Sequence, residues 1–146
     1  MAKAIINHDC KTELNEALLR ATPARLAIMT LFESSDKPLD VQTMIEFLDK
    51  KGIKTDPATV FRIVNLFTEK GLTKQIQLNE GKFRYELAAR GNHHHFICEN
   101  CGAIEDIADC NIDELEKTLR IKKGLLVKRH SLEFFGLCKN CSAQRN

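Results

Sequence analysis

Apolar side chains recur at helical spacing through the first half of the chain. The clearest helix is expected between Asp56 and Gly71, because Asp56-Pro57 is a typical helix start and Gly71 a typical stop. Its apolar stripe comprises Val60, Ile63, Val64 and Phe67. A buried stripe of this length predicts a helix that packs one face against a core.

The same kind of pattern predicts three earlier helices. The first is expected from about Thr12 to Arg20, and the second begins after an N-cap at Thr22 and runs to about Phe32. The third begins after an N-cap at Asp40 and ends before Gly52. The stripes comprise Leu14, Ala17 and Leu18 in the first helix and Val41, Met44, Ile45 and Leu48 in the third.

Two β segments follow these helices, at residues 72–78 and 82–87. They are joined by Asn79-Glu80-Gly81, a three-residue loop whose final glycine suits a hairpin. Helices followed by a hairpin form the order of a winged helix-turn-helix. We therefore expect one such domain over residues 1–87.

The composition changes at residues 88–92, which we interpret as a linker. Strands are expected at residues 94–98 and 103–107, and a capping-box-like start at Asn111 and Glu114 predicts a short helix. That helix carries Ile112, Leu115 and Leu119 and ends at Gly124, and a long strand is expected over residues 125–135. The fold class is thus α+β, with a small α/β domain over residues 88–146.

Composition narrows the function classes only slightly. The 146 residues are 43% apolar and 29% charged, which is typical of a folded protein, and the net charge of +2 provides no bulk field for nucleic acid. No apolar run is long enough to span a bilayer, so no membrane association is expected. We expect a cytoplasmic protein because no secretory leader is evident.

The two Cys-x-x-Cys pairs are the strongest chemical signal. Cys98 and Cys101 form one pair and Cys138 and Cys141 the other, and each pair is expected at the tip of a turn. Four thiolates with no open position are typical of a structural Zn²⁺ site. The alternative is two redox-active or merely buried thiol pairs. Cys10 and Cys110 are more typical of ordinary core or surface thiols than of ligands.

A histidine tract stands just before the first cysteine pair. In a strand, His93 and His95 would point to one face and His94 to the other, so the tract can serve two centres. Additional candidate ligands are Glu86, Asp106, Asp113 and His130. Mixed histidine and carboxylate ligands do not fix the metal. The alternative is a solvated histidine run.

The face of the fourth helix opposite its apolar stripe carries Ala58, Thr59, Phe61, Arg62 and Asn65. Arginine and asparagine side chains bind phosphates and base edges, so this face is a candidate DNA-reading surface. An ordinary solvated helix face is the alternative. The chain has no Gly-x-Ser-x-Gly motif and no phosphate-binding loop, so we do not expect an enzyme.

Together these motifs resemble the ferric-uptake-regulator family over nearly the whole chain. The resemblance is carried by Thr22-Pro23-x-Arg25, by the segment from Asp56 to Leu72, by His93-His94-His95 with the first cysteine pair, and by His130-Ser131-Leu132 with the second. The family contains iron, zinc and manganese uptake repressors and peroxide-responsive repressors. The resemblance implies a metal-dependent repressor that binds palindromic, double-stranded operator DNA as a homodimer.

The resemblance also implies roles for individual residues. Residues 88–146 would form a dimerisation and metal-sensing domain with structural Zn²⁺ on the four cysteines. Regulatory Fe²⁺, Zn²⁺ or Mn²⁺ would be bound by Glu86, His93, His95 and Asp106, and a third metal site would comprise His94, Asp113 and His130. DNA contacts would come from Thr59, Phe61, Arg62, Asn65, Lys74, Lys82 and Arg84.

The chain departs from the family pattern at three points. The loop from Asp36 to Asp40 lacks the histidine that normally completes the regulatory site. Phe61 stands where the family usually has tyrosine, and Asn92 stands where the third site normally has a fourth ligand. Two other functions therefore stay open: a peroxide- or redox-responsive repressor of the same family, and a thiol-redox zinc-switch protein.

Overall fold

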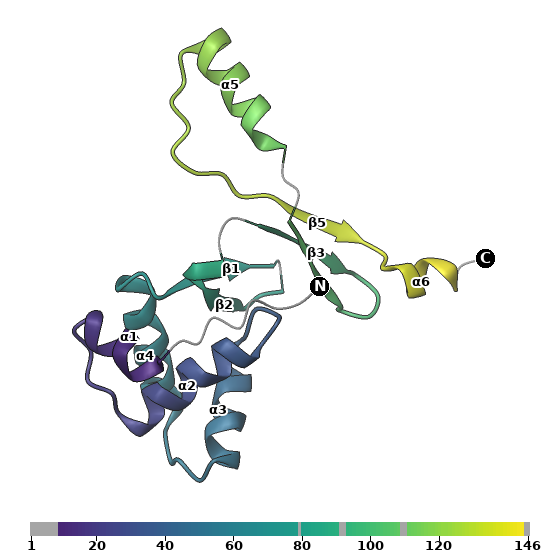
Figure 1. Cartoon of the computed structure of the whole chain (residues 1–146). Coiled ribbons are helices and arrows are strands. Elements are labelled where there is room, and N and C mark those ends of the chain that lie inside the picture. Colours follow the sequence, from purple (N-terminus) through teal and green to yellow (C-terminus); the bar gives the residue numbers. More distant parts are fainter. Residues whose placement is uncertain (1–8, 79, 91–92, 109–110, 145–146) are drawn as a thin grey trace. The chain divides into compact units, whose positions relative to one another are not determined.

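Four helices form the first part of the fold, and each begins at a capping residue that the sequence supplies. They are α1 (Cys10–Glu16), α2 (Pro23–Ser34), α3 (Val41–Lys50) and α4 (Pro57–Glu69). The structure, a computed structural model, describes residues 9–78, 80–90, 93–108 and 111–144 (Figure 1). Thr22, Asp40 and Asp56 each accept a hydrogen bond from a backbone N–H at the expected helix start, because a helix leaves its first N–H groups unpaired.

The hairpin after the helices consists of β1 (Thr73–Gln77) and β2 (Phe83–Leu87). The two strands pair antiparallel, with Gln77 opposite Phe83 and Thr73 opposite Leu87. Leu39, in the loop before α3, forms a reciprocal pair of backbone hydrogen bonds with Tyr85 in β2, each 2.8 Å long. The loop is therefore anchored to the wing of a winged helix. Asn79, in the expected three-residue loop, lies outside the described residues.

The core of this part forms where the apolar stripes of the helices meet. The predicted stripe of α4 is buried in full, and Met44 and Leu48 of α3 are completely buried. The complete buried set is Leu14, Leu19, Ile28, Met29, Phe32, Leu39, Val41, Met44, Leu48, Val60, Ile63, Val64, Phe67 and Tyr85. The order of helices and hairpin confirms the winged helix-turn-helix.

The chain divides into two separately packed units, Met1–Ala89 and Arg90–Asn146. A short 3₁₀ helix, η1 (Ala88–Arg90), lies at the division, and Gly91 and Asn92 of the expected linker lie outside the described residues. We call the first the winged-helix unit and the second the cysteine unit.

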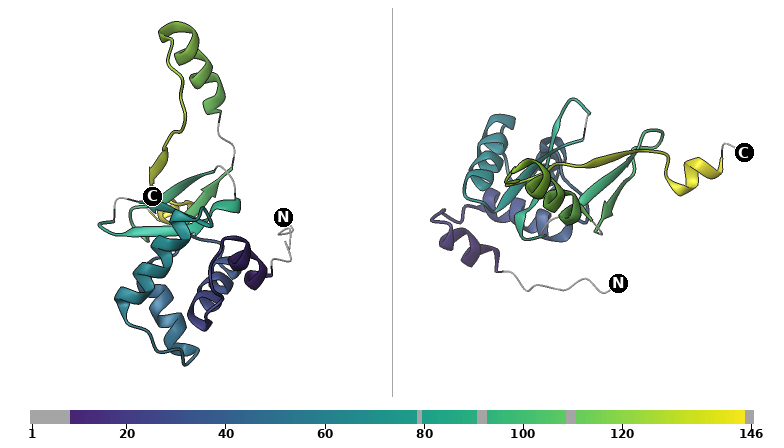
Figure 2. Two further views of the ribbon diagram at one scale, coloured as in Figure 1. Left: turned by 90° about the vertical axis from the view of Figure 1, so that its left-hand side faces the viewer. Right: turned by 90° about the horizontal axis from the view of Figure 1, so that it is seen from above.

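The cysteine unit contains a three-stranded sheet and two helices (Figure 2). The elements are β3 (His94–Cys98), β4 (Ile104–Ile107), α5 (Ile112–Lys123), β5 (Glu133–Gly136) and α6 (Lys139–Ala143). The central strand β3 pairs antiparallel with β4 and parallel with β5. This mixed sheet confirms the α+β class.

Three local expectations were wrong. The first helix ends at Glu16, and Leu18 lies 86% exposed at φ 61° instead of in the stripe. Asn111 precedes α5 without a side-chain capping hydrogen bond, so the capping box does not form. The expected long strand is regular only from Glu133, because that is where its pairing with β3 begins.

No helix in the described ranges combines the length and apolar character needed to cross a bilayer.

Candidate metal centres and nucleic-acid interface

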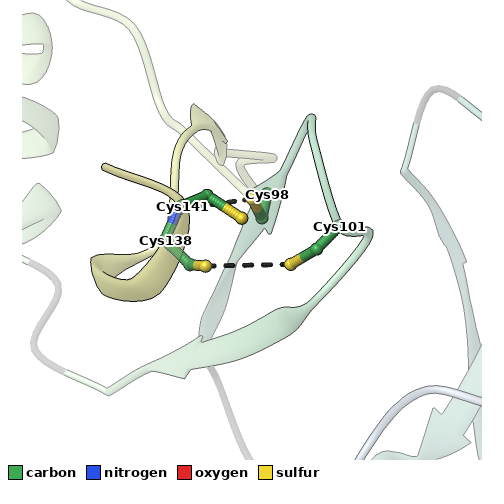
Figure 3. Close-up of side chains that lie close together, drawn as sticks. All are labelled: Cys98, Cys101, Cys138 and Cys141. Atoms are coloured by element: carbon green, nitrogen blue, oxygen red, sulfur yellow. Dashed lines mark hydrogen bonds between the residues drawn. The ribbon is translucent and has the colours of Figure 1, made fainter. Parts of the chain in front are cut away.

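The four predicted zinc ligands lie together in the cysteine unit. Cys98 ends β3 and Cys101 lies in the turn after it, whereas Cys138 is the N-cap of α6 and Cys141 lies within that helix (Figure 3). The second pair thus sits at a helix start and not at the tip of a turn. All four sulfur atoms lie within 4.8 Å of one another, and no described cysteine forms a disulfide.

The sulfur spacing fits tetrahedral zinc. The Sγ atoms of Cys101 and Cys138 are 3.7 Å apart. Zinc–sulfur bonds of about 2.3 Å at tetrahedral angles place two sulfurs about 3.8 Å apart. Four sulfur donors leave no open coordination position, so the arrangement supports a structural ion and not a catalytic one.

Hydrogen bonds make the four thiols unequal. Backbone N–H groups of Cys101 and Cys138 lower the pKa of Cys98 to about 6. The backbone N–H of Ala103 lowers the pKa of Cys101, but the three neighbouring sulfurs outweigh it and raise that pKa to about 11. Negative charge on one sulfur opposes charge on the next, so a cation is needed to keep all four as thiolates.

The histidine tract divides between two groups. His93 immediately precedes β3, and alternate residues along an extended chain point to opposite faces. The Nε2 atoms of His93 and His95 lie 3.9 and 3.8 Å from the same oxygen of Asp106. Asp106 stands directly opposite His95 in the pairing of β3 and β4. The structure therefore brings three of the four predicted regulatory ligands together within the cysteine unit.

Glu133 orients His95 from the other side. Its Oε2 accepts a hydrogen bond from the backbone N–H of His95 at 3.1 Å and lies 3.4 Å from Nδ1 of the ring. A carboxylate on one ring nitrogen leaves the other nitrogen for a metal, which is a common arrangement around metal-binding histidines. Arg90 also reaches Asp106, at 3.5 Å. The fourth predicted ligand, Glu86, lies in β2 of the winged-helix unit, 3.2 Å from Lys74.

The third predicted site is partly assembled. The Nε2 atoms of His94 and His130 are 3.2 Å apart, close to the spacing of about 3.3 Å that two nitrogen ligands of one tetrahedral metal would have. Oε1 of Glu116 lies 3.0 Å from Nδ1 of His130. The carboxylate in contact with His130 is thus Glu116, which lies one turn further along α5 than the predicted Asp113. Asn92 lies outside the described residues.

The candidate DNA surface of α4 faces away from the core. Phe61, Arg62 and Asn65 are exposed, and Thr59 is half-buried, with its backbone N–H bonded to Asp56. Phe61 is 47% exposed, so the aromatic ring is available for contact with a partner. The described side chains thus include a polar and aromatic face on the helix that precedes the wing.

The predicted wing cations all lie against carboxylates. Lys74 pairs with Glu86, Lys82 with Asp40 at 2.5 Å, and Arg84 with Glu80 at 2.8 Å. Arg84 also donates to the backbone carbonyl of Pro38, at 3.1 Å. The expected DNA contacts did not anticipate these ion pairs. Lys82 and Asp40 are separated by 42 positions, so their pairing gives no local sequence signal.

Sequence reasoning missed three polar residues that contact the predicted ligands: Asn100, Glu116 and Glu133. Asn100 donates its side-chain N–H to Sγ of Cys141 at 3.2 Å. A weak signal existed for Asn100, which lies between two cysteines, and for Glu116, which shares a helix with Asp113. Glu133 was detectable only with the parallel register of β3 and β5 in hand.

The chain is similar to known proteins in both sequence and structure. Residues 16–135 match the sequence profile described as the Ferric uptake regulator family. The chain is 29% identical over 136 residues to the ferric uptake regulation protein of Bordetella parapertussis, covering 92% of this chain and 98% of that protein. It is 32% identical over 133 residues to the peroxide operon regulator of Bacillus subtilis, with 91% of each covered. The crystal structure of the Vibrio cholerae ferric uptake regulator superposes with a TM-score of 0.76 at 27% identity, covering 89% of this chain and all of that one.

Proposed function

Because the chain belongs to the ferric uptake regulator family, we propose that it is a metal-dependent transcriptional repressor and not an enzyme. It binds palindromic operator DNA as a homodimer in the cytoplasm and controls genes of metal uptake or homeostasis. The observation that carries this proposal is the convergence of His93 and His95 on one oxygen of Asp106. Relatives named as ferric uptake regulation proteins support it.

Residues 1–87 serve as the DNA-binding domain in this proposal. The recognition surface is α4, with Thr59, Phe61, Arg62 and Asn65 directed at the DNA. The exposure of Phe61, Arg62 and Asn65 supports this role, because the opposite side of the helix is fully occupied by the core. A solved relative titled as a zinc uptake regulator complexed with zinc and DNA has the same fold.

Residues 88–146 serve as the dimerisation and metal-sensing domain. The dimer surface is supported by α5 and the segment after it, where large apolar side chains are exposed at Leu115, Ile121, Leu125 and Leu126. In Figure 1, α5 stands apart from the sheet of its own unit, and the exposure of these four side chains shows that their own chain leaves them largely uncovered. A second copy of the chain is the occupant we propose.

Three metal sites are assigned in this proposal. Structural Zn²⁺ is held by Cys98, Cys101, Cys138 and Cys141. Regulatory Fe²⁺, Zn²⁺ or Mn²⁺ is held by Glu86, His93, His95 and Asp106. The third site uses His94 and His130, with a carboxylate from Asp113 or Glu116 on α5. Imidazole and carboxylate donors suit all three regulatory metals.

The regulatory ligands act through the connection between the domains. Glu86 of the DNA-binding domain would hold the cation together with His93, His95 and Asp106, and the cation would supply the positive charge that these ligands share. Glu133 lies 3.4 Å from Nδ1 of His95, which leaves Nε2 on the side of the ligand group. Restricting the two DNA-binding domains favours orientations that engage both half-sites of a palindrome, which lie about 34–36 Å apart or multiples of that.

The test compares DNA binding with the regulatory site empty and filled. Protein carrying only structural zinc is titrated with operator DNA selected by the protein itself, and then with Fe²⁺, Mn²⁺ or Zn²⁺ added. We expect a 5- to 150-fold gain in affinity, corresponding to about 1–3 kcal/mol of coupling, and an equal gain in metal affinity with DNA. Alanine at both His93 and His95 should abolish the gain. Equal affinity with the site shown to be filled would overturn the proposal.

A peroxide-responsive repressor is the second candidate. The similarity to a peroxide operon regulator favours it. In this case iron at the regulatory site would direct peroxide to oxidise a histidine ligand, and mass spectrometry after treatment with Fe²⁺ and peroxide would find oxygen added at His93 or His95.

A thiol-redox zinc switch differs from both repressors because oxidation would release its zinc. The exposed Cys101 would be oxidised first, and zinc would then be lost. Retention of zinc in mild peroxide would exclude the thiol switch.

A further inference from the structure

Asp40 uses its two carboxylate oxygens for different partners. One oxygen accepts hydrogen bonds from the backbone N–H and the hydroxyl of Thr43, at 2.8 and 2.7 Å, and so caps α3. The other oxygen accepts from the ammonium group of Lys82 at 2.5 Å. Asp40 is only 8% exposed. Burial raises its pKa, but the bonds from Lys82 and Thr43 outweigh burial and lower it to about 2. The carboxylate is therefore a permanent anion at neutral pH.

Lys82 immediately precedes β2, the second wing strand, and the family resemblance implies a DNA contact for it. Its side chain is 48% exposed, so solvent reaches it on one side while Asp40 contacts it on the other. Glu80, the nearby wing carboxylate, is bonded by both Nε and Nη2 of Arg84. Asp40 is thus the carboxylate in contact with the Lys82 ammonium.

We propose that Asp40 is a positioning residue that holds the ammonium group of Lys82 away from DNA phosphate. The positive charge of Lys82 is then partly neutralised when the wing meets DNA. This inference rests on the proposed DNA-binding function. A phosphate must compete with a carboxylate already in contact, and Asp40 is itself fixed by Thr43 and cannot follow Lys82 outward. Neutralising Asp40 releases the ammonium group for the DNA backbone.

The test is a double-mutant cycle on the full-length, metal-loaded protein. Wild type, Asp40→Asn, Lys82→Gln and the double variant are titrated against a fixed mixed-sequence DNA duplex across a range of salt concentrations. Asparagine caps a helix as well as aspartate does, so α3 keeps its start. Asp40→Ser is a second neutral capping variant, and Asp49→Asn, at the other end of α3, is the charge-matched control.

We expect Asp40→Asn to bind the duplex about two- to fivefold more tightly at low salt, the range found for ion pairs that solvent reaches, as it reaches Lys82. The gain should shrink as salt rises, because phosphate contacts release counterions. It should disappear in the Lys82→Gln background and be absent from Asp49→Asn. That pattern is one that a purely structural role for Asp40 would not produce.

Two results would overturn the inference. One is an unchanged affinity for both Asp40→Asn and Asp40→Ser in protein whose circular dichroism matches wild type. The other is an equal gain with and without Lys82, which would reflect general loss of negative charge. A wild-type protein that binds neither this duplex nor selected operator DNA would instead overturn the proposed function itself.

Discussion

At the scale of single residues, N–H donors distinguish the sulfur atoms of the cysteine cluster. The backbone N–H of Cys138 donates to Sγ of Cys98 at 3.3 Å, and the side chain of Asn100 donates to Sγ of Cys141 at 3.2 Å. Each donor offsets part of the negative charge that a thiolate carries, and a hydrogen bond to an ionised group is stronger than one between neutral groups. Asn100 therefore links the turn after β3 to α6 through a sulfur atom.

Asn100→Asp should weaken zinc binding. The substitution replaces a donor with a carboxylate beside a thiolate, and loss of such a supporting partner typically costs ~10- to 100-fold in metal affinity. Competition with a chromophoric chelator measures the affinity, and Glu99→Gln in the same turn is the control. Zinc affinity within twofold of wild type would show that Asn100 does not support the site.

Leu18→Gly should stabilise the winged-helix unit. Leu18 has a left-handed backbone at φ 61° and is 86% exposed, so glycine relieves strain and loses almost no buried apolar surface. We expect the free energy of unfolding to rise by roughly 0.5–1 kcal/mol. This is a net value, because the greater entropy of glycine in the unfolded chain offsets part of the relieved strain. Thermal unfolding followed by circular dichroism gives the midpoint, and Leu18→Ala keeps the Cβ atom as a control. An equal gain in both variants would contradict the explanation.

Residue identity predicted which cysteines lie together better than it predicted the polar residues in contact with the candidate ligands. Cys98, Cys101, Cys138 and Cys141 were assigned from spacing alone, because two intervening residues give a recurrent geometry. Glu133 and Glu116 were not predicted. Their contacts with His95 and His130 can be inferred only when the strand pairing and the position of α5 are known. Contacts between distant segments depend on tertiary structure.

At the scale of elements, a helix or strand was predicted correctly where its own sequence determines its structure. Asp56, Pro57, a buried stripe and Gly71 all favour the same helix, and α4 has the expected boundaries. By contrast, the strand predicted from residue 125 exists only from Glu133, because a strand is defined by the neighbour to which it bonds. The sequence of residues 125–132 contains no local signal that shows where pairing with that neighbour begins.

The Asp40 link between α3 and the wing should lose its stabilising effect in acid. Its pKa falls from 3.8 to about 2 on folding, so the contribution is complete above pH 4 and disappears as pH falls toward 2. It amounts to at most about 2.5 kcal/mol, because the pKa falls from 3.8 to about 2 and one pKa unit equals about 1.4 kcal/mol. Denaturant unfolding of wild type and Asp40→Asn at several pH values should show a difference that narrows over this window. A constant difference would contradict the assignment.

At the scale of the whole molecule, the two units depend on different sources of stability. The winged-helix unit has a contiguous core of buried apolar side chains contributed by all four helices and the wing. In the described part of the cysteine unit, the buried apolar residues are Ile97, Ile104 and the cysteines Cys98 and Cys141. Small domains with limited cores commonly need a metal to fold. The cysteine unit should therefore depend on zinc far more strongly than the winged-helix unit does.

Removing zinc should consequently unfold one unit and spare the other. Treatment with a strong chelator, or Cys98→Ser with Cys138→Ser, leaves the sheet of β3, β4 and β5 without the ion that joins its cysteine-bearing ends. Amide hydrogen exchange should lose protection throughout Arg90–Asn146 while the buried helices α2, α3 and α4 remain protected. Readdition of Zn²⁺ to the chelated protein should restore protection, and the serine variant should not respond. Equal loss of protection in α4 would mean that the units fold as one, because cooperative unfolding spreads only through shared packing.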